Sequence, residues 1–215
     1  MISVLIETMR VRRGRIPLFH HHAARFAASL AALGLPGGLS LDDAAREADS
    51  VQEGVVRVEA GSSGVQVTSR SHDSPRPISV RTLPGFQPYP HKTTDREQFA
   101  RACTEAQAAG ADDALLLSAG GEPAEGTTWS LFWWDVRGLQ TPALALGILP
   151  GVARARFAEM GALSEGTCAV DLLALRGCFA ANAVRGVIPI REINGALVRA
   201  DERTVRLAAR FWPAH

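Results

Sequence analysis

The most turn-rich stretch of the sequence, residues 84–90, constrains how the rest of the chain can fold. It holds three prolines and one glycine in seven positions. Because proline lacks a backbone N–H and fixes φ, neither a helix interior nor a central strand continues through such a stretch. We therefore expect two domains, residues 1–86 and 92–215, joined by a linker at 87–91. Clefts between domains are common places for small-molecule sites, so a site is expected beside this linker.

The first domain is expected to be a small α/β layer. Phe26, Leu30 and Leu33 recur at helical spacing, and Gly34 and Pro36 end that helix. Alternating apolar residues bounded by turn residues predict the strands. In chain order we expect strands at 2–9 and 16–19, helices at 20–33 and 41–51, a hairpin of strands at 55–60 and 65–70, and a strand at 78–83.

The second domain is expected to be larger and richer in strands. Thr94 and Glu97 fit a capping box, which predicts a helix from there to about residue 109. The remaining elements follow from apolar runs and their glycine breaks. We expect a strand at 113–118 with its hairpin partner at 125–135, a helix from 152 to about 161, a short helix beginning at 171, strands on both sides of a turn within 178–190, and a helix at 201–211.

Lys92 is the only lysine among 23 basic residues. A guanidinium stays protonated in proteins, whereas an amine can lose its proton and form a Schiff base. A chain that uses arginine almost everywhere else and lysine here is a candidate for amine chemistry, although a plain surface lysine is the alternative. The capping box places Lys92 just before a helix N-terminus, which is expected to lower its pKa.

Three further features predict groups that bind an anion or a buried partner. Glu125 leads into an apolar strand, and a buried carboxylate there needs a partner. Gly147 and Gly151 flank a helix start, so the backbone N–H groups of Val152 and Ala153 are free to bind phosphate. Arg25, on the second turn of an early helix, can reach an anion at the domain boundary.

The run His20-His21-His22 is a possible metal ligand set. Adjacent residues on a helix point in different directions, so we expect that these histidines hold no metal.

Composition narrows the class of protein. The net charge is +1 and the basic residues are scattered, which argues against nucleic-acid binding. No apolar run has membrane-spanning length, and the N-terminus lacks signal-peptide order. Cys103, Cys168 and Cys178 form no C-x-x-C pair and indicate reduced thiols. We expect a soluble cytoplasmic protein with a small-molecule partner and no nucleic-acid or membrane partner.

Taken together, these motifs in this order resemble the class IV aminotransferases, the pyridoxal-phosphate (PLP) enzymes of fold type IV. The resemblance covers nearly the whole chain. It rests on Glu7-Thr8-Met9-Arg10-Val11 with Gly14, His22-Ala23-Ala24-Arg25, Lys92, Asp112-Asp113-Ala114-Leu115-Leu116-Leu117, Glu125-Gly126-Thr127 and Gly147-Ile148-Leu149-Pro150-Gly151-Val152.

The resemblance implies an α/β (α+β) fold, with a small N-terminal α/β domain and a C-terminal β-rich pseudo-barrel domain with helices. It also implies a homodimer with PLP in the cleft between the domains. Lys92 would be the catalytic residue and hold PLP as a Schiff base, and Glu125 would hydrogen-bond the pyridine nitrogen. The phosphate would be bound by Arg25, Val152, Ala153, Asn182 and Ala183.

Within the family, Lys92-Thr93-Thr94-Asp95-Arg96 is similar to the Lys-x-x-(Asn/Asp)-Arg pattern of 4-amino-4-deoxychorismate lyases. Branched-chain aminotransferases carry a tyrosine five residues after the lysine, where this chain has Glu97. The resemblance thus implies a lyase that releases pyruvate and 4-aminobenzoate for folate synthesis. Arg10 or Arg96 would pair with substrate carboxylates, unless their roles are structural.

Two alternatives remain open at this point. The first is a class IV aminotransferase acting on a branched-chain or D-amino acid, because the scaffold is shared. The second is a non-enzymatic relative, because Trp129-Ser130 stands where most members have Ser-Asn.

Overall fold

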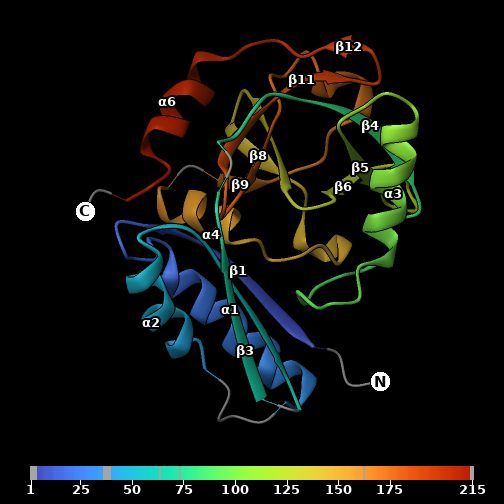
Figure 1. Ribbon diagram of the computed structural model, residues 1–215. Coiled ribbons are helices and arrows are strands. Elements are labelled where there is room, and N and C mark those ends of the chain that lie inside the picture. Colours follow the sequence, from blue (N-terminus) through green and yellow to red (C-terminus); the bar gives the residue numbers. More distant parts are fainter. Residues whose placement is uncertain (1–3, 36–39, 63, 73, 162, 214–215) are drawn as a thin grey trace.

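The computed structural model describes residues 4–35, 40–62, 64–72, 74–161 and 163–213. Its strands form two sheets, one of three strands and one of nine. Figure 1 shows the three-stranded sheet and its helices (blue to teal) in the lower half of the view, with the larger sheet above. Within these residues, no helix is both long enough and apolar enough to cross a membrane.

One face of the three-stranded sheet is covered by two helices. The elements are β1 (Leu5–Arg12), α1 (Phe19–Leu33), α2 (Asp42–Val51), β2 (Glu53–Gly61) and β3 (Gly64–Arg70). β2 pairs antiparallel with β1 and β3. Because side chains alternate across a strand, Met9 and Val58 pack against Phe26 of α1, while Thr8 and Arg57 face the other way. The predicted hairpin and both predicted helices are confirmed.

The first strand and its turn differ from the prediction. β1 runs to Arg12, and residues 2 and 3 of the predicted strand lie outside the described residues. The predicted strand at 16–19 does not form, because α1 already begins at Phe19. Arg12 and Arg15 make only an isolated bridge around Arg13 and Gly14, whose φ angles of 51° and 72° turn the chain sharply.

The nine-stranded sheet contains the other strands of the described residues. Its strands are β4 (Ile78–Pro84), β5 (Asp113–Leu117), β6 (Pro123–Gly126), β7 (Ser130–Asp135), β8 (Gly138–Thr141), β9 (Leu163–Glu165), β10 (Phe179–Asn182), β11 (Gly186–Ile193) and β12 (Ala196–Leu197). The order is β6-β5-β4-β11-β10-β7-β8-β9, and β12 pairs with β11. This curled mixed sheet, with helices packed around it, gives the α/β fold that the resemblance implied.

β4 belongs to the larger sheet, although the expected boundary at residue 86 assigned it to the first domain. It pairs in parallel with β5 and with β11. Its buried residues Ile78 and Val80 pack with Leu115 and Ile190 of those neighbours. The apolar alternation predicted the strand correctly but carries no information about its partner. The division of the chain into domains stays a prediction.

The predicted hairpin partner of β5 is divided into two strands with different neighbours. β6 pairs with β5, whereas β7 pairs with β10 and β8. The chain breaks between them because the Gly126 N–H donates to the Trp129 carbonyl oxygen in a tight turn. A Cβ on Gly126 would lie 2.2 Å from the Trp129 ring, so only glycine fits beneath the indole.

The helices of this part are α3 (Glu97–Ala108), α4 (Val152–Glu159), α5 (Val170–Leu173) and α6 (Glu202–Arg210), with a 3-10 turn at Leu144–Leu146. The predicted capping box is wrong, since the N-cap of α3 is Arg96 and no side chain caps it. The N-cap of α6 is Asp201, whose carboxylate accepts from the Arg203 N–H.

Candidate active site

A cavity of about 370 Å³ contains most of the predicted site residues. The small sheet supplies its uncovered face, including Ile6 and Thr8 of β1. The larger part supplies side chains from the loops and strand ends that face this surface. Among the lining residues are Arg25, Lys92, Arg96, Glu125, Val152, Ala153, Asn182 and Ala183.

Lys92 is held in a short extended segment that runs beside β1. Its carbonyl oxygen accepts a hydrogen bond from the Ile6 N–H at 2.8 Å. The hydroxyl of buried Tyr89 donates to the Thr93 carbonyl oxygen at 2.6 Å and accepts from the Thr93 N–H at 2.7 Å. These bonds fix the backbone at Lys92 and Thr93, so the Lys92 side chain enters the cavity from a defined position.

The amine of Lys92 is poised to exchange protons at neutral pH. Desolvation in the cavity, followed by the charges of Arg25 and Arg96, lowers the pKa of Lys92 to about 7. The prediction of a lowered pKa is confirmed, but its predicted cause is not. α3 begins only at Glu97, and desolvation rather than a helix N-terminus has the largest effect.

Glu125 lies in β6 and is buried, with 5 % of its surface exposed. Burial raises the pKa of Glu125 to about 7, although its Oε2 accepts a hydrogen bond from the Leu149 N–H at 3.1 Å. The turn that follows is anchored by Asp113, which accepts from the Thr127 hydroxyl at 2.6 Å and the Trp129 indole at 2.9 Å. A carboxyl at this position could accept a hydrogen bond from a cationic ring nitrogen in the cavity.

Arg25 is oriented by a buried carboxylate that the sequence reasoning did not identify as a site residue. Glu7 accepts from Arg25 Nε at 2.8 Å and from His22 Nδ1 at 2.6 Å. Burial opposes ionisation of Glu7, but the charges and hydrogen bonds of Arg25 and His22 outweigh it and lower its pKa to about 2. Burial lowers the pKa of His22, and its Nε2 has no partner among the described residues, so a neutral ring with its proton on Nδ1 fits best.

The start of α4 and the β10–β11 turn form a second cluster of donors on the cavity wall. Gly151 is the N-cap of α4, and the first N–H groups of a helix have no partner within it. A Cβ on Gly151 would lie 2.7 Å from Ser130 Oγ, so the glycine permits close approach here. Asn182 Oδ1 accepts from the Val184 N–H at 3.0 Å and the Arg185 N–H at 2.7 Å, which shapes the turn beside Ala183.

The two arginines predicted for substrate carboxylates lie in different places. Arg96 lines the cavity, where its guanidinium donates to the Thr127 carbonyl oxygen and stacks 4.8 Å from the Phe99 ring centroid. Arg10 is not among the lining residues and pairs with Glu53 at 2.9 Å. The structure therefore brings Arg96, but not Arg10, to Lys92.

Other cavity residues were missing from the sequence-based set. Thr127 lines it from the turn after Glu125, and Ser130 lines it from the start of β7. Arg57 and Arg70 line it from β2 and β3. Arg57 stands between the buried Val56 and Val58, an alternation that already marks it as facing away from the helices. What lies on that side depends on the larger sheet, which local sequence does not reveal.

Among the described residues, five arginines but only one carboxylate, that of Glu125, line the cavity, so its wall is positively charged. Arg25 and the α4 N-terminus suit a phosphate, Lys92 offers an amine of lowered pKa, and Glu125 offers a buried carboxyl. The residues present therefore fit PLP. Such a site defines a class of enzymes that bind an anionic, amine-reactive cofactor between two sheets.

The family within that class is established by comparison with known proteins. Residues 4–193 match the amino-transferase class IV family, so the chain belongs to the class IV aminotransferases. Members of this family are PLP-dependent enzymes, either transaminases or lyases, and PLP is the cofactor of this protein. A search of curated proteins found no match.

Solved structures confirm fold type IV. The "Putative 4-amino-4-deoxychorismate lyase" of Legionella pneumophila has a TM-score of 0.85 at 20% identity, covering 97% of this chain and 91% of that one. The "Putative amino-acid aminotransferase" of Mesorhizobium loti has a TM-score of 0.80 at 27% identity, covering 88% and 99%. A PLP-bound "hypothetical aminotransferase" of Mycobacterium tuberculosis has a TM-score of 0.85 at 18% identity, covering 98% and 89%.

Proposed function

We propose that the protein is a PLP-dependent 4-amino-4-deoxychorismate lyase, which releases pyruvate and leaves 4-aminobenzoate for folate synthesis. The observation that carries the proposal is the segment from Lys92 to Arg96. It has the lyase spacing, and the side chains at both of its ends line one cavity. The positive cavity wall also suits the substrate, because aminodeoxychorismate brings two carboxylates in addition to the cofactor phosphate.

Each part of the cofactor would be bound by a residue with suitable chemistry. Lys92 binds PLP covalently through its amine, and Glu125 hydrogen-bonds the ring nitrogen. The phosphate is held by Arg25, by the N–H groups of Val152 and Ala153, and by the turn at Asn182 and Ala183. Bound PLP supplies an electron-withdrawing ring joined to the substrate amine.

Lys92 is proposed to move the proton in the lyase reaction. Released from the cofactor by the substrate amine, it takes the ring proton from the carbon that bears that amine. The enolpyruvyl group leaves with the electron pair of its C–O bond and gains a proton to become pyruvate, while the ring becomes aromatic. A lysine pKa of about 7 allows this transfer at neutral pH. Arg96, which lines the same cavity, would pair with a substrate carboxylate.

The direct test is formation of 4-aminobenzoate and pyruvate from aminodeoxychorismate by the PLP-loaded protein. We expect equal amounts of both products from the wild type and none from Lys92→Ala. Lys92→Arg keeps the positive charge but cannot bind PLP covalently, so it should lack both turnover and the visible absorption of lysine-bound PLP. Turnover by either variant would contradict the role of Lys92.

A class IV aminotransferase is the second candidate, favoured by the likeness to the aminotransferase structures named above. A transaminase would convert its cofactor to the amine form when a branched-chain or D-amino acid is added without a keto acid. Loss of the lysine-bound absorption under those conditions, with no 4-aminobenzoate from aminodeoxychorismate, would favour this candidate over the lyase.

We also propose that the enzyme is a cytoplasmic homodimer with a small-molecule amino substrate. The family resemblance supports the dimer, and the free thiols of Cys103, Cys168 and Cys178 fit a reducing compartment. Light scattering after size exclusion should give twice the 22.9 kDa chain mass. A monomer that retains full activity would contradict the dimer.

A further inference from the structure

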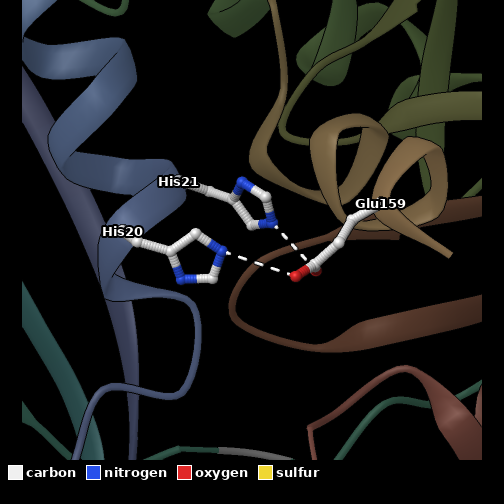
Figure 2. A group of neighbouring side chains, drawn as sticks. All are labelled: His20, His21 and Glu159. Carbon is white, nitrogen blue, oxygen red and sulfur yellow. Dashed lines mark hydrogen bonds and ion pairs between the residues drawn. The ribbon is translucent and has the colours of Figure 1, made fainter.

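Two of the three consecutive histidines meet a carboxylate from the other half of the molecule. Figure 2 shows the rings of His20 and His21, at the start of α1, directed toward Glu159 at the end of α4. His21 Nε2 lies 3.2 Å from Glu159 Oε2, and His20 Nε2 lies 3.8 Å from Oε1. The third histidine turns away into the core to pair with Glu7. The expectation that adjacent histidines diverge therefore fails for the first pair.

The spacing of these atoms matches what a metal ion requires. One ligand atom from each of the three residues lies within 4.8 Å of the other two. Metal–ligand bonds of about 2.0–2.2 Å in a tetrahedral zinc site place neighbouring ligand atoms roughly 3.3 Å apart. The 3.2 Å distance from His21 Nε2 to Glu159 Oε2 is close to that value, and the 3.8 Å distance from His20 Nε2 to Oε1 is longer, so side-chain rotations would have to draw His20 inward to complete the ligand set.

The local chemistry selects the kind of ion. Two imidazoles and one carboxylate are the donors preferred by zinc and similar divalent transition metals, rather than by calcium or magnesium. The side chains of His20 and Glu159 are 60% and 44% exposed, which leaves an open approach and room for water as a further ligand.

One neighbour competes with a cation. Arg156 Nη1 donates to Glu159 Oε2 at 2.7 Å. The other oxygen, Oε1, is the one nearest His20 and stays available to an ion. Arg156 is also anchored through Nε to the Phe211 carbonyl oxygen at 2.8 Å, so it does not depend on Glu159 for its position. Its charge should weaken the binding of a cation without blocking the site.

We propose that His20, His21 and Glu159 form a binding site for a zinc-like divalent transition metal that links α1 to α4. The site lies outside the set of residues that line the cofactor cavity, and it joins the helix that carries Arg25 to the helix whose N-terminus faces the same cavity. Its role is structural, because it would hold together two helices that pack on different sheets.

Calorimetric titration of chelator-washed, PLP-loaded protein with zinc chloride tests the proposal. We expect one zinc per chain in the wild type. His20→Ala, His21→Ala and Glu159→Gln should each weaken binding at least about tenfold, since even supporting residues of metal sites contribute roughly 10–100-fold. The matched control is His91→Gln, which removes a histidine that bonds Ser29 outside the cluster and should leave zinc binding unchanged.

A gain-of-affinity variant and a stability readout make the test independent of misfolding. Arg156→Gln removes the competing cation and should tighten zinc binding several-fold. Zinc should raise the melting temperature of the wild type, but not of His20→Ala, whose metal-free melting temperature should match the wild type because the His21–Glu159 contact remains. No zinc binding by the wild type, or wild-type affinity in the three ligand variants, would overturn the proposal and leave a simple ion pair.

Discussion

One buried carboxylate, that of Glu7, should make the stability of the protein depend strongly on pH in acid. Its pKa is about 2 in the folded protein against 4.5 for the unperturbed side chain. A lowered carboxyl pKa contributes stability that is fully present above about pH 4.5 and is lost as the pH falls toward 2. The free energy of unfolding should therefore drop by about 3 kcal/mol from this group over that window.

Urea unfolding of the wild type and Glu7→Gln between pH 2 and 7 measures this contribution. The variant should be less stable at pH 7, because Arg25 loses its paired charge, and its stability should depend less on acid. Glu105→Gln, on the exposed side of α3, should follow the wild-type curve. Parallel acid dependence in Glu7→Gln and the wild type would mean that another group controls acid unfolding.

Lys92 should make the stability of the cofactor-free protein depend on pH in a different way, because it destabilises the folded state at low pH. Its pKa is lowered from 10.5 to about 7, so the folded state binds a proton less readily than the unfolded state. The loss of folding stability caused by Lys92 is complete below about pH 7 and decreases as the pH rises toward 10.5. Apo Lys92→Met should therefore be more stable than the apo wild type at pH 6, by at least about 1 kcal/mol, and the difference should shrink at pH 9. A difference that is independent of pH would contradict a desolvated amine.

At the residue scale, the sequence revealed the chemistry better than the geometry. Lys92 was identifiable because it is the only lysine, and Glu125 because a carboxylate before an apolar strand needs a partner. The orientation of Arg25 by Glu7 was not identifiable, since it depends on packing α1 against β1. Arg10 and Arg96 looked equivalent in sequence and separate only in the folded structure.

At the scale of elements, the turn between β6 and β7 depends on one glycine. Gly126→Ala would place a Cβ 2.2 Å from the Trp129 ring, and the indole is held by its bond to Asp113. We expect this variant to lose about 1–3 kcal/mol of stability, as overpacked sites do, and to bind PLP more weakly because Glu125 is the preceding residue. Gly120→Ala, which meets only ordinary contacts at 3.7 Å, should change the free energy of unfolding by less than about 0.5 kcal/mol. Equal stability of the two variants would show that the turn can relax.

The extended segment around Lys92 depends on the Tyr89 hydroxyl. Tyr89→Phe leaves the backbone groups of Thr93 without their partner, which should cost about 1–3 kcal/mol of stability. Because the hydroxyl acts through the backbone, kcat should fall while the absorption of lysine-bound PLP persists. Denaturant unfolding and steady-state kinetics measure the two effects. Complete loss of that absorption would instead indicate direct contact with the cofactor.

Element types were largely predictable, while their pairing was not. Periodicity correctly located α1, α2, the β2–β3 hairpin and β4. It could not tell that β4 joins β11, because Ile78 and Ile190 are far apart in sequence. It also joined β6 and β7 into one strand, since an apolar run does not show that the Gly126 turn changes the partner.

At the scale of the whole molecule, the two sheets should unfold as one unit. The Thr94 N–H donates to the Val4 carbonyl oxygen, and Arg12 stacks 5.6 Å from the Trp212 ring centroid. All four tryptophans lie beyond residue 128, so their fluorescence reports mainly on the larger part. We expect urea transitions followed by tryptophan fluorescence and by far-UV circular dichroism to coincide in the PLP-loaded protein. Separate midpoints would show that the three-stranded sheet opens independently.

The position of β11 between β4 and β10 has a consequence for biosynthesis. Translation produces β4 long before β11, the strand that must lie beside it, and that edge of β4 stays unpaired until residue 193 has left the ribosome. During that interval one edge of β4 offers unpaired backbone groups to other chains. Nascent chains are therefore most exposed to aggregation before they can bind cofactor, so chaperone dependence should be greatest there.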